Sequence, residues 1–182
     1  MEDRFPDIDE ARHWYGVALD GIRHLKRVTS DAHPLYISDD TADQLFGMTE
    51  VQWRNFAERK ADEHETFASL ALMAACEGGI RRDCLWRADS RGRPMFSARF
   101  RALLLKPGHV SLSCILDAWQ SSLGREHFLI RYLQQLRGLY SDRNALAHGR
   151  TLLSRPDFSL IYSRVFTIRN KWHQAVEDFR GF

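Results

Sequence analysis

The chain has 182 residues, of which 44% are apolar and 12% aromatic, so it can bury a substantial core and is not a long disordered protein. Its three cysteines, Cys76, Cys84 and Cys114, form no C-x-x-C pair, which excludes a zinc ribbon and argues against a disulfide-stapled secreted domain. The acidic start and the short apolar runs predict neither a signal peptide nor a membrane span. We therefore expect a cytoplasmic protein.

Charge is distributed unevenly along the chain. Residues 1–80 hold 16 acidic and 8 basic side chains, whereas residues 81–182 hold 8 acidic and 18 basic ones. This asymmetry indicates a polyanionic partner for the basic half. Arginine outnumbers lysine by 22 to 4, which suits phosphate recognition but also follows from a codon bias toward G and C. The sequence leaves both explanations open.

Helical periodicity dominates, and no repeat or linker divides the chain, so we predict one all-α domain, a bundle of five or six helices. A first helix is expected over residues 10–28, followed by an irregular connection over residues 29–48. A long helix then begins in a capping box that Thr49 opens. The glycine pair at residues 78–79 is expected to weaken or end this helix.

Four further helices are predicted in the second half of the chain. A basic loop over residues 90–94 precedes two shorter helices, over residues 95–106 and 110–123, which Pro107 and Gly108 separate. Apolar stripes at helical spacing predict two more helices, over residues 128–140 and 158–179. The aromatic side chains of the last stripe are expected to lie in the core.

A candidate catalytic motif follows the stripe over residues 128–140. The run R-N-A-L-A-H-G at residues 143–149 resembles the R-x(4-6)-H signature of the HEPN superfamily, helical domains many of whose members are metal-independent endoribonucleases. The Asn after the Arg, the small apolar residues and the Gly after the His distinguish this run from a second pair, Arg59 and His64. The resemblance extends over about residues 50–175, with residues 1–49 as a helical extension.

The residues of the motif suit cleavage of RNA, whose 2′-OH supplies the nucleophile. His148 is the candidate for proton transfer, and Arg143 for stabilising charge on the phosphoryl oxygens. Asn144 shares a helix face with His148 and can bond the imidazole or a substrate oxygen. On an ideal helix Arg143 and His148 point about 140° apart, so they converge only if the long Arg side chain reaches round or the helix opens at Gly149.

Other residues are expected to support this site. Glu77 lies in an apolar stretch and needs a cation, for which Arg143 and Arg81 are the two alternatives. Contacts to RNA phosphates are expected along a basic track, whose alternative reading is a solvated basic face. Its members are Arg81, Arg82, Arg87, Arg91, Arg93, Arg99 and Arg101, together with Arg150 beside the motif.

The resemblance implies an endoribonuclease, acting as a toxin or a phage-defence effector, that needs no cofactor. We expect RNA as its substrate, a homodimer formed through the motif helices, and an antitoxin or other partner protein as a further class of partner. The spacings Asp9/His13 and Asp20/His24 lack a third ligand, so no metal site is predicted.

Two other readings of the motif stay open. The chain is alternatively a non-catalytic HEPN-like module that binds a nucleotide or a partner protein. In the plainest reading, Arg143 and His148 only cap and pair within a structural bundle.

Overall fold

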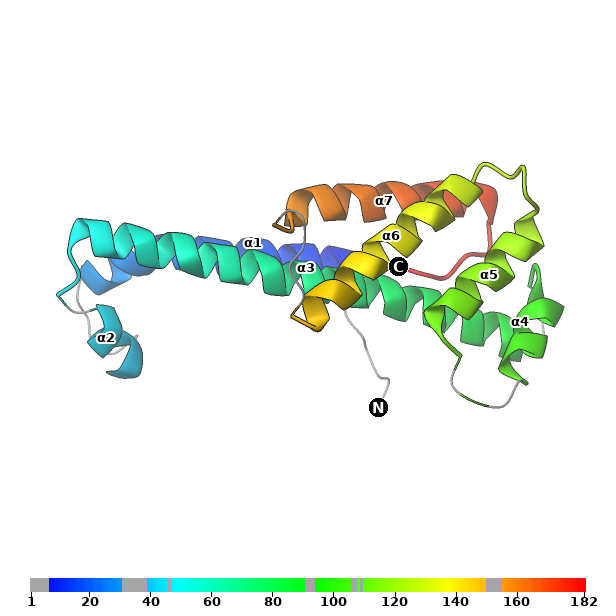
Figure 1. The fold of residues 1–182 in the computed structure, drawn as a ribbon, viewed down its shortest axis with the longest axis horizontal. Coiled ribbons are helices and arrows are strands. Elements are labelled where there is room, and N and C mark those ends of the chain that lie inside the picture. The colour runs from blue at the N-terminus through cyan, green and yellow to red at the C-terminus, as the bar shows by residue number, and fades with distance from the viewer. Residues whose placement is uncertain are drawn as a thin grey trace.

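The structure, a computed structural model, describes residues 7–30, 39–45, 47–90, 94–105, 108, 110–149 and 155–182. In this part of the chain all regular structure is helical, which confirms the predicted all-α class (Figure 1). Seven helices are described where five or six were predicted, because a short helix lies within the expected irregular connection. They are α1 (Ile8–Ser30), α2 (Asp39–Leu45), α3 (Glu50–Asp89), α4 (Ser97–Leu104), α5 (Leu112–Leu123), α6 (Ile130–Ala147) and α7 (Phe158–Ala175).

Helix α3 is the axis of the molecule. Its start is fixed by the predicted capping box, in which the Thr49 side chain accepts a hydrogen bond from the Gln52 N–H and the Gln52 side chain accepts one from the Thr49 N–H. The prediction that the helix ends at the glycine pair is wrong, because α3, which is 40 residues long, continues past it to Asp89. A Cβ atom on Gly79 would lie 2.7 Å from the Phe182 Cα, so this glycine lets the C-terminal segment cross the helix closely.

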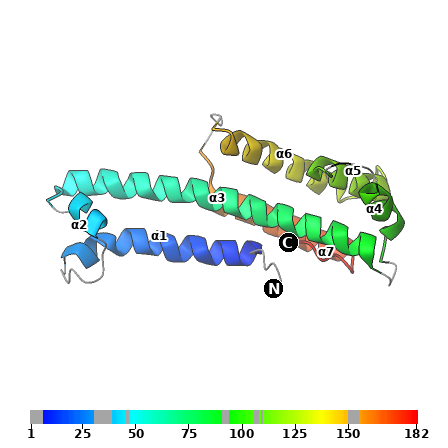
Figure 2. The ribbon, with the colours of Figure 1, turned by 90° about the horizontal axis from the view of Figure 1, so that it is seen from below.

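Helices α1 and α2 and the first half of α3 form a narrow arm that extends from the rest of the molecule (Figure 1). Helix α1 runs antiparallel to α3 along this arm (Figure 2). The two helices are joined at His64, whose Nε2 atom lies 3.0 Å from the Tyr15 carbonyl oxygen and whose ring stacks on Tyr15 at 5.2 Å. The edge of His64 also meets Trp14, with ring centroids 4.9 Å apart.

The second half of α3 and helices α4 to α7 form the body. At its centre the fully buried Trp119 packs edge-on against Phe100 and Trp172, with ring centroids 5.2 and 5.1 Å apart. The chain after α7 turns back along the body, where Phe179 stacks on Trp172 at 4.8 Å (Figure 1). Helices α6 and α1 lie on opposite sides of α3 (Figure 2), so these two helices contribute to different faces of the molecule.

Candidate functional site

The motif lies at the C-terminal end of α6. The His148 N–H donates to the Asn144 carbonyl oxygen at 3.1 Å, and Gly149 has a φ of 66°, the left-handed conformation that ends helices. Gly149 therefore caps the helix, as predicted. The His148 side chain is exposed just past the last turn, where solvent or a ligand can reach it.

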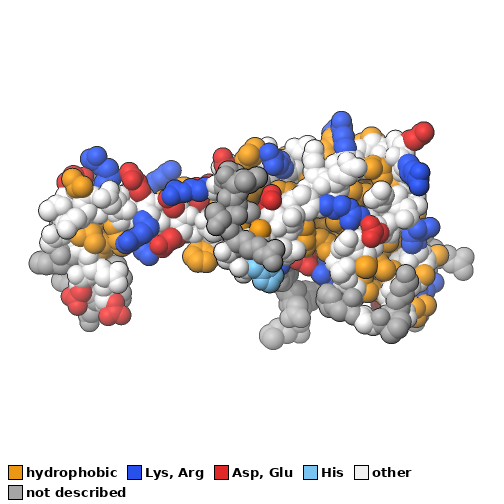
Figure 3. Space-filling view, viewed as in Figure 1, with side chains coloured by type: hydrophobic (Ala, Val, Ile, Leu, Met, Phe, Trp, Pro, Cys, Tyr) orange, Lys and Arg blue, Asp and Glu red, His pale blue; other side chains and the backbone are white. Residues whose placement is uncertain are grey.

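A groove of about 520 Å³ lies between α3, α5 and α6, and we refer to it as the α6 groove. On the face of the molecule that carries α5 and α6, basic and acidic side chains surround apolar ones (Figure 3). Motif residues Arg143 and Asn144 line this groove, whereas His148 is not among its lining residues. The other polar side chains around it include Glu77, Arg81, Ser113, Arg137 and Tyr140.

Arg143 differs from the other two arginines of the groove in its partners. Arg81 is paired with Glu77 at 2.7 Å, and Arg137 is paired with Asp117 at 2.6 Å. The half-buried Arg143 donates from Nη1 to the Asn144 Oδ1 atom at 3.1 Å and has no ion pair with a carboxylate in the described part of the chain. Its guanidinium therefore keeps its charge available for an anion in the groove.

Glu77 takes Arg81, not Arg143, as its partner. The Arg81 Nε donates to the carboxylate at 2.8 Å, and the Arg81 Nη1 donates to the Val110 carbonyl oxygen at 2.8 Å. Burial alone would raise the pKa of Glu77, but the neighbouring Tyr140 hydroxyl and the charges of Arg81 and Arg143 outweigh it and hold that pKa below its ordinary value. Glu77 is therefore a carboxylate that orders Arg81 and adds negative charge near Arg143.

Sequence reasoning missed Tyr140 and Arg137 as residues of this groove. The Tyr140 hydroxyl is buried beside Glu77, and burial, followed by its interaction with the Glu77 carboxylate, raises its pKa well above the ordinary range. Tyr140 was read only as part of an apolar stripe. The available signal was helical spacing, since Arg137, Tyr140 and the motif residue Asn144 follow one another at intervals of three and four residues on α6.

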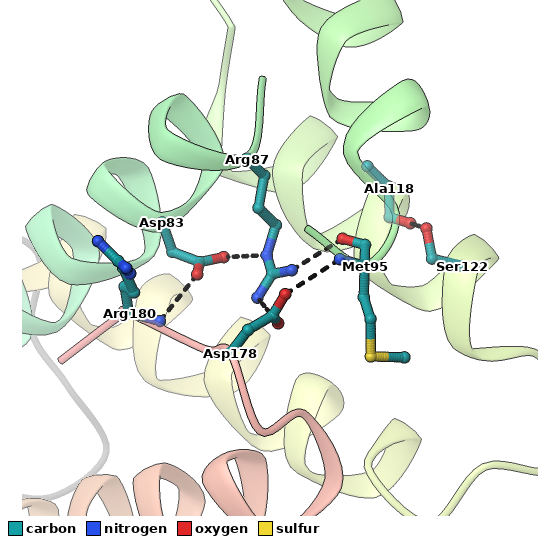
Figure 4. Close-up of polar contacts among 7 residues, drawn as sticks. All are labelled: Asp83, Arg87, Met95, Ala118, Ser122, Asp178 and Arg180. Atoms are coloured by element: carbon teal, nitrogen blue, oxygen red, sulfur yellow. Dashed lines mark hydrogen bonds and ion pairs between the residues drawn. The ribbon is translucent and has the colours of Figure 1, made fainter. Parts of the chain in front are cut away.

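Arg87, predicted to contact RNA, is instead a structural residue. It is fully buried, and its guanidinium donates to Asp83, Asp178 and the Met95 carbonyl oxygen, each at 2.8 Å (Figure 4). Every terminal nitrogen of the guanidinium is thus engaged inside the body. The prediction for Arg87 is wrong because a side chain with no exposed surface cannot reach a phosphate.

The remaining members of the basic track separate into three groups. Arg81 lies in the α6 groove and is held by Glu77 and Val110. The exposed members are Arg82 on α3 and Arg99 and Arg101 on α4. The predicted contacts Arg91, Arg93 and Arg150 lie outside the described residues.

Comparison with protein families, with curated proteins and with solved structures finds no match to this chain. Across the described ranges, no helix combines the length and apolar composition needed to cross a bilayer. Nor do three or more His, Cys, Asp or Glu side chains gather there as a group that could hold a metal ion. The function is therefore inferred from the α6 groove and the residues that follow it.

Proposed function

We propose that the chain is a HEPN-like endoribonuclease that cleaves RNA through attack of the substrate 2′-OH, with Arg143 and His148 as catalytic residues. The observation that carries this proposal is the state of Arg143, which lines a groove while its charge is not taken up by a carboxylate among the described residues. His148 follows within the next turn and a half of the chain and is exposed.

In this reaction the RNA supplies the nucleophile, so the protein has to move protons and stabilise charge. The 2′-oxygen loses its proton and forms a bond to the adjacent phosphorus, while the bond from phosphorus to the 5′-oxygen breaks and that oxygen takes up a proton. His148 serves in proton transfer. Arg143 donates to the phosphoryl oxygens, where its planar guanidinium can make two parallel hydrogen bonds.

Asn144 and the Glu77–Arg81 pair serve Arg143 in this proposal. The Asn144 Oδ1 atom accepts from Arg143 and so limits the directions in which the guanidinium can point. Because Arg81 already occupies the Glu77 carboxylate, Glu77 acts on Arg143 through its charge rather than by a direct bond. The products are a 2′,3′-cyclic phosphate and a free 5′-OH.

Two copies of the chain complete the proposed site. Arg143 lines the α6 groove and His148 does not, so one chain presents the two side chains in different places. A two-fold pairing of α6 helices would bring the Arg of one copy to the His of the other. A cellular role as a toxin or phage-defence effector, in the cytoplasm and under the control of a partner protein, fits such an activity.

The proposal is tested by incubating the purified protein with single-stranded and structured RNA in excess EDTA and determining the chemical ends of the products. We expect 2′,3′-cyclic phosphate and 5′-OH ends. Arg143→Lys should cleave about 10²-fold more slowly, because a point charge does not reproduce two parallel bonds to phosphate. Arg125→Lys, an exposed change before α6, is the matched control and should cleave as wild type. Products with 5′-phosphate ends, or full activity of Arg143→Lys, would contradict the proposal.

A second function is favoured by one observation, the position of His148 outside the lining of the groove. A groove with Arg143 and the Ser113 hydroxyl also suits the phosphate of a nucleotide that is bound and not cleaved. Binding of a nucleotide with no cleavage of any RNA would favour this alternative.

A further inference from the structure

A second groove, of about 420 Å³, lies between α1 and α7, and we refer to it as the α1–α7 groove. Its lining is aromatic, hydroxylic and cationic, unlike the packed interior beside it. Because α1 and α6 are on opposite sides of α3 (Figure 2), this groove is separate from the α6 groove. The side chains and backbone that line it include Arg12, Tyr15, Gly16, Phe158, Tyr162 and Phe166.

The aromatic rings form a continuous series from the core to the surface. Tyr15 stacks on the buried Phe158 at 4.0 Å, Phe158 is stacked with Tyr162 at 6.4 Å, and Tyr162 is stacked with Phe166 at 5.9 Å. Phe166 is 38% exposed, so the outer end of the series is open to a ligand. The expectation that all aromatic side chains of α7 lie in the core is therefore wrong for Phe166. Exposed rings in a groove favour a flat aromatic ligand.

Guanidinium groups lie over the same rings. The Arg12 Cζ is 4.9 Å from the centre of the Tyr162 ring, and the Arg169 Cζ is 4.8 Å from the centre of the Phe166 ring. A guanidinium stacks on nucleobases as it does on aromatic side chains, and it also pairs with phosphate. A ligand with both flat rings and negative charge can use both properties.

Cations and carboxylates both lie around the groove. Helix α7 carries Arg164, Arg169 and Lys171 and contains no Asp or Glu. Each of the nearby carboxylates already accepts a hydrogen bond: Glu65 from the Phe158 N–H at 3.0 Å and Asp157 from the Leu160 N–H at 2.8 Å. Asp9 accepts from the Tyr162 hydroxyl at 2.6 Å and from the Arg169 Nη1 at 2.7 Å. Asp9 is thus already occupied, and it holds these two side chains in place.

We propose that the α1–α7 groove binds unstacked bases of single-stranded nucleic acid, with the exposed Phe166 ring and the Arg12 guanidinium that lies over Tyr162 as the stacking surfaces. Bases in a duplex are stacked on one another and are not available to these rings. This inference rests on the proposed function, which makes the bound strand an RNA substrate. It adds that the substrate class is single-stranded RNA.

Gly16 offers a direct way to fill the groove. It lines the groove from within α1, and a Cβ atom built on it meets nothing within 4 Å. The Cβ atom of Gly16→Leu therefore meets open space at the groove, and the change replaces a poor helix former by a good one. Gly21→Leu is the matched control, since Gly21 is exposed on the same helix, also has open space around its Cβ position and does not line the groove.

The test measures the fluorescence anisotropy of a labelled single-stranded oligodeoxythymidylate in EDTA. This probe lacks the 2′-OH and is not cleaved, so binding is measured apart from catalysis. Wild type and Gly21→Leu should bind equally, and Gly16→Leu should bind about tenfold more weakly, the loss expected for one stacked base. Phe166→Ala should show a similar loss, whereas Leu160→Ala, which is also exposed on α7, should not.

Equal binding by Gly16→Leu and wild type would overturn the inference, as would equal losses in Gly16→Leu and Gly21→Leu. Binding of duplex as tight as binding of single strand would overturn it as well. If Gly16→Leu weakens binding of the probe but wild type cleaves no RNA, the result would support this inference and contradict the proposed nuclease. If wild type cleaves RNA but Gly16→Leu binds the probe as tightly as wild type does, the result would contradict this inference and leave the proposed nuclease standing.

Discussion

Arg87 holds three segments of the body together. Its guanidinium joins Asp83 on α3 to Asp178 after α7 and to the Met95 carbonyl oxygen before α4. The Asp178 carboxylate also accepts from the Met95 N–H at 3.0 Å, so the cluster is bonded on several sides (Figure 4). In a buried cluster of this kind, the loss of one charged member leaves its partners uncompensated.

Arg87→Ala should therefore lower the free energy of unfolding by about 3–5 kcal/mol, because Asp83 would be left buried and without its cation. Arg82→Ala is the control, since Arg82 is exposed on the same helix, and it should change the free energy by no more than about 0.5 kcal/mol. Urea unfolding of the two variants measures the difference. Similar values for both would contradict the structural role of Arg87.

The contrast between Arg87 and Arg143 shows what the sequence could and could not predict about single residues. Both arginines belonged to candidate sites, but their partners decide their roles. Asp83, four residues before Arg87, suggests an ordinary surface pair, and nothing local indicates Asp178. Arg143 is predicted as a candidate from its immediate neighbours alone, since the motif consists of the last five residues of α6 and the two residues after them.

At the scale of elements, the C-terminal segment depends on the absence of a side chain at Gly79. The Phe182 backbone crosses α3 at this point, and Phe182 packs edge-on against Trp172 at 6.1 Å. A methyl group at position 79 would displace this backbone. The contact explains why α3 contains glycine in its interior, where glycine is otherwise unfavourable.

Gly79→Ala should destabilise the protein by about 1–3 kcal/mol, despite the better helix propensity of alanine, because the C-terminal segment must shift. Gly138→Ala on α6 is the matched control. Gly138 is exposed and has open space at its Cβ position, so this change should stabilise by up to about 1 kcal/mol. Thermal unfolding distinguishes the two, and a stabilising Gly79→Ala would contradict the close approach.

Asp9 fastens α1 to α7. The hydrogen bond from Arg169, followed by that from Tyr162, holds the pKa of Asp9 below its ordinary value of 3.8, although burial acts in the opposite direction. A carboxylate whose pKa is lowered by folding stabilises the folded state above its ordinary pKa, and this contribution is lost as the pH falls through the lowered pKa.

Asp9→Asn should therefore lower the free energy of unfolding at pH 7 by about 1 kcal/mol, since the site is partly exposed and screened by solvent. The difference from wild type should shrink as the pH falls below about 3.8. Urea unfolding over a pH series measures it. A difference that stays constant with pH would show that the Asp9 charge makes no contribution.

Elements were predictable where their signals are local. The capping box at Thr49 and the glycine cap at Gly149 fix two helix ends within a few residues of sequence, and both were predicted. The role of Gly79 inside α3 was not predictable, because the backbone that it accommodates belongs to Phe182, far away in the sequence. The exposed Phe166 was likewise read as core, since helical spacing alone does not show whether another element covers a face.

On the scale of the whole molecule, α3 separates two grooves of different character. The α6 groove presents the Arg143 guanidinium, which forms no ion pair with a carboxylate among the described residues. The α1–α7 groove presents aromatic rings with cations over them. We propose that the α6 groove takes the scissile phosphate and that the α1–α7 groove takes bases. Because His148 lies outside the α6 groove, the proposed site requires two copies of the chain.

Mixing Arg143→Ala protein with His148→Ala protein tests that pairing. If each site takes Arg143 from one copy and His148 from the other, exchange of subunits should restore about a quarter of the wild-type rate, since half of the dimers are mixed and each has one intact site. Each variant alone is the control and should be inactive. Cleavage by a wild-type protein that sediments as a monomer at the assay concentration would contradict the dimer.

Single-turnover cleavage of saturating RNA by His148→Ala in EDTA tests the assignment of His148 as the proton-transfer residue, with binding of the non-cleavable oligodeoxythymidylate measured in parallel. His24→Ala, at an exposed histidine on α1, is the matched control. We predict that His148→Ala slows cleavage by about 10²- to 10⁴-fold and leaves binding nearly unchanged, because proton transfer acts in the transition state. Cleavage by His148→Ala at the rate of His24→Ala and wild type would contradict the assignment of His148 and with it the proposed mechanism.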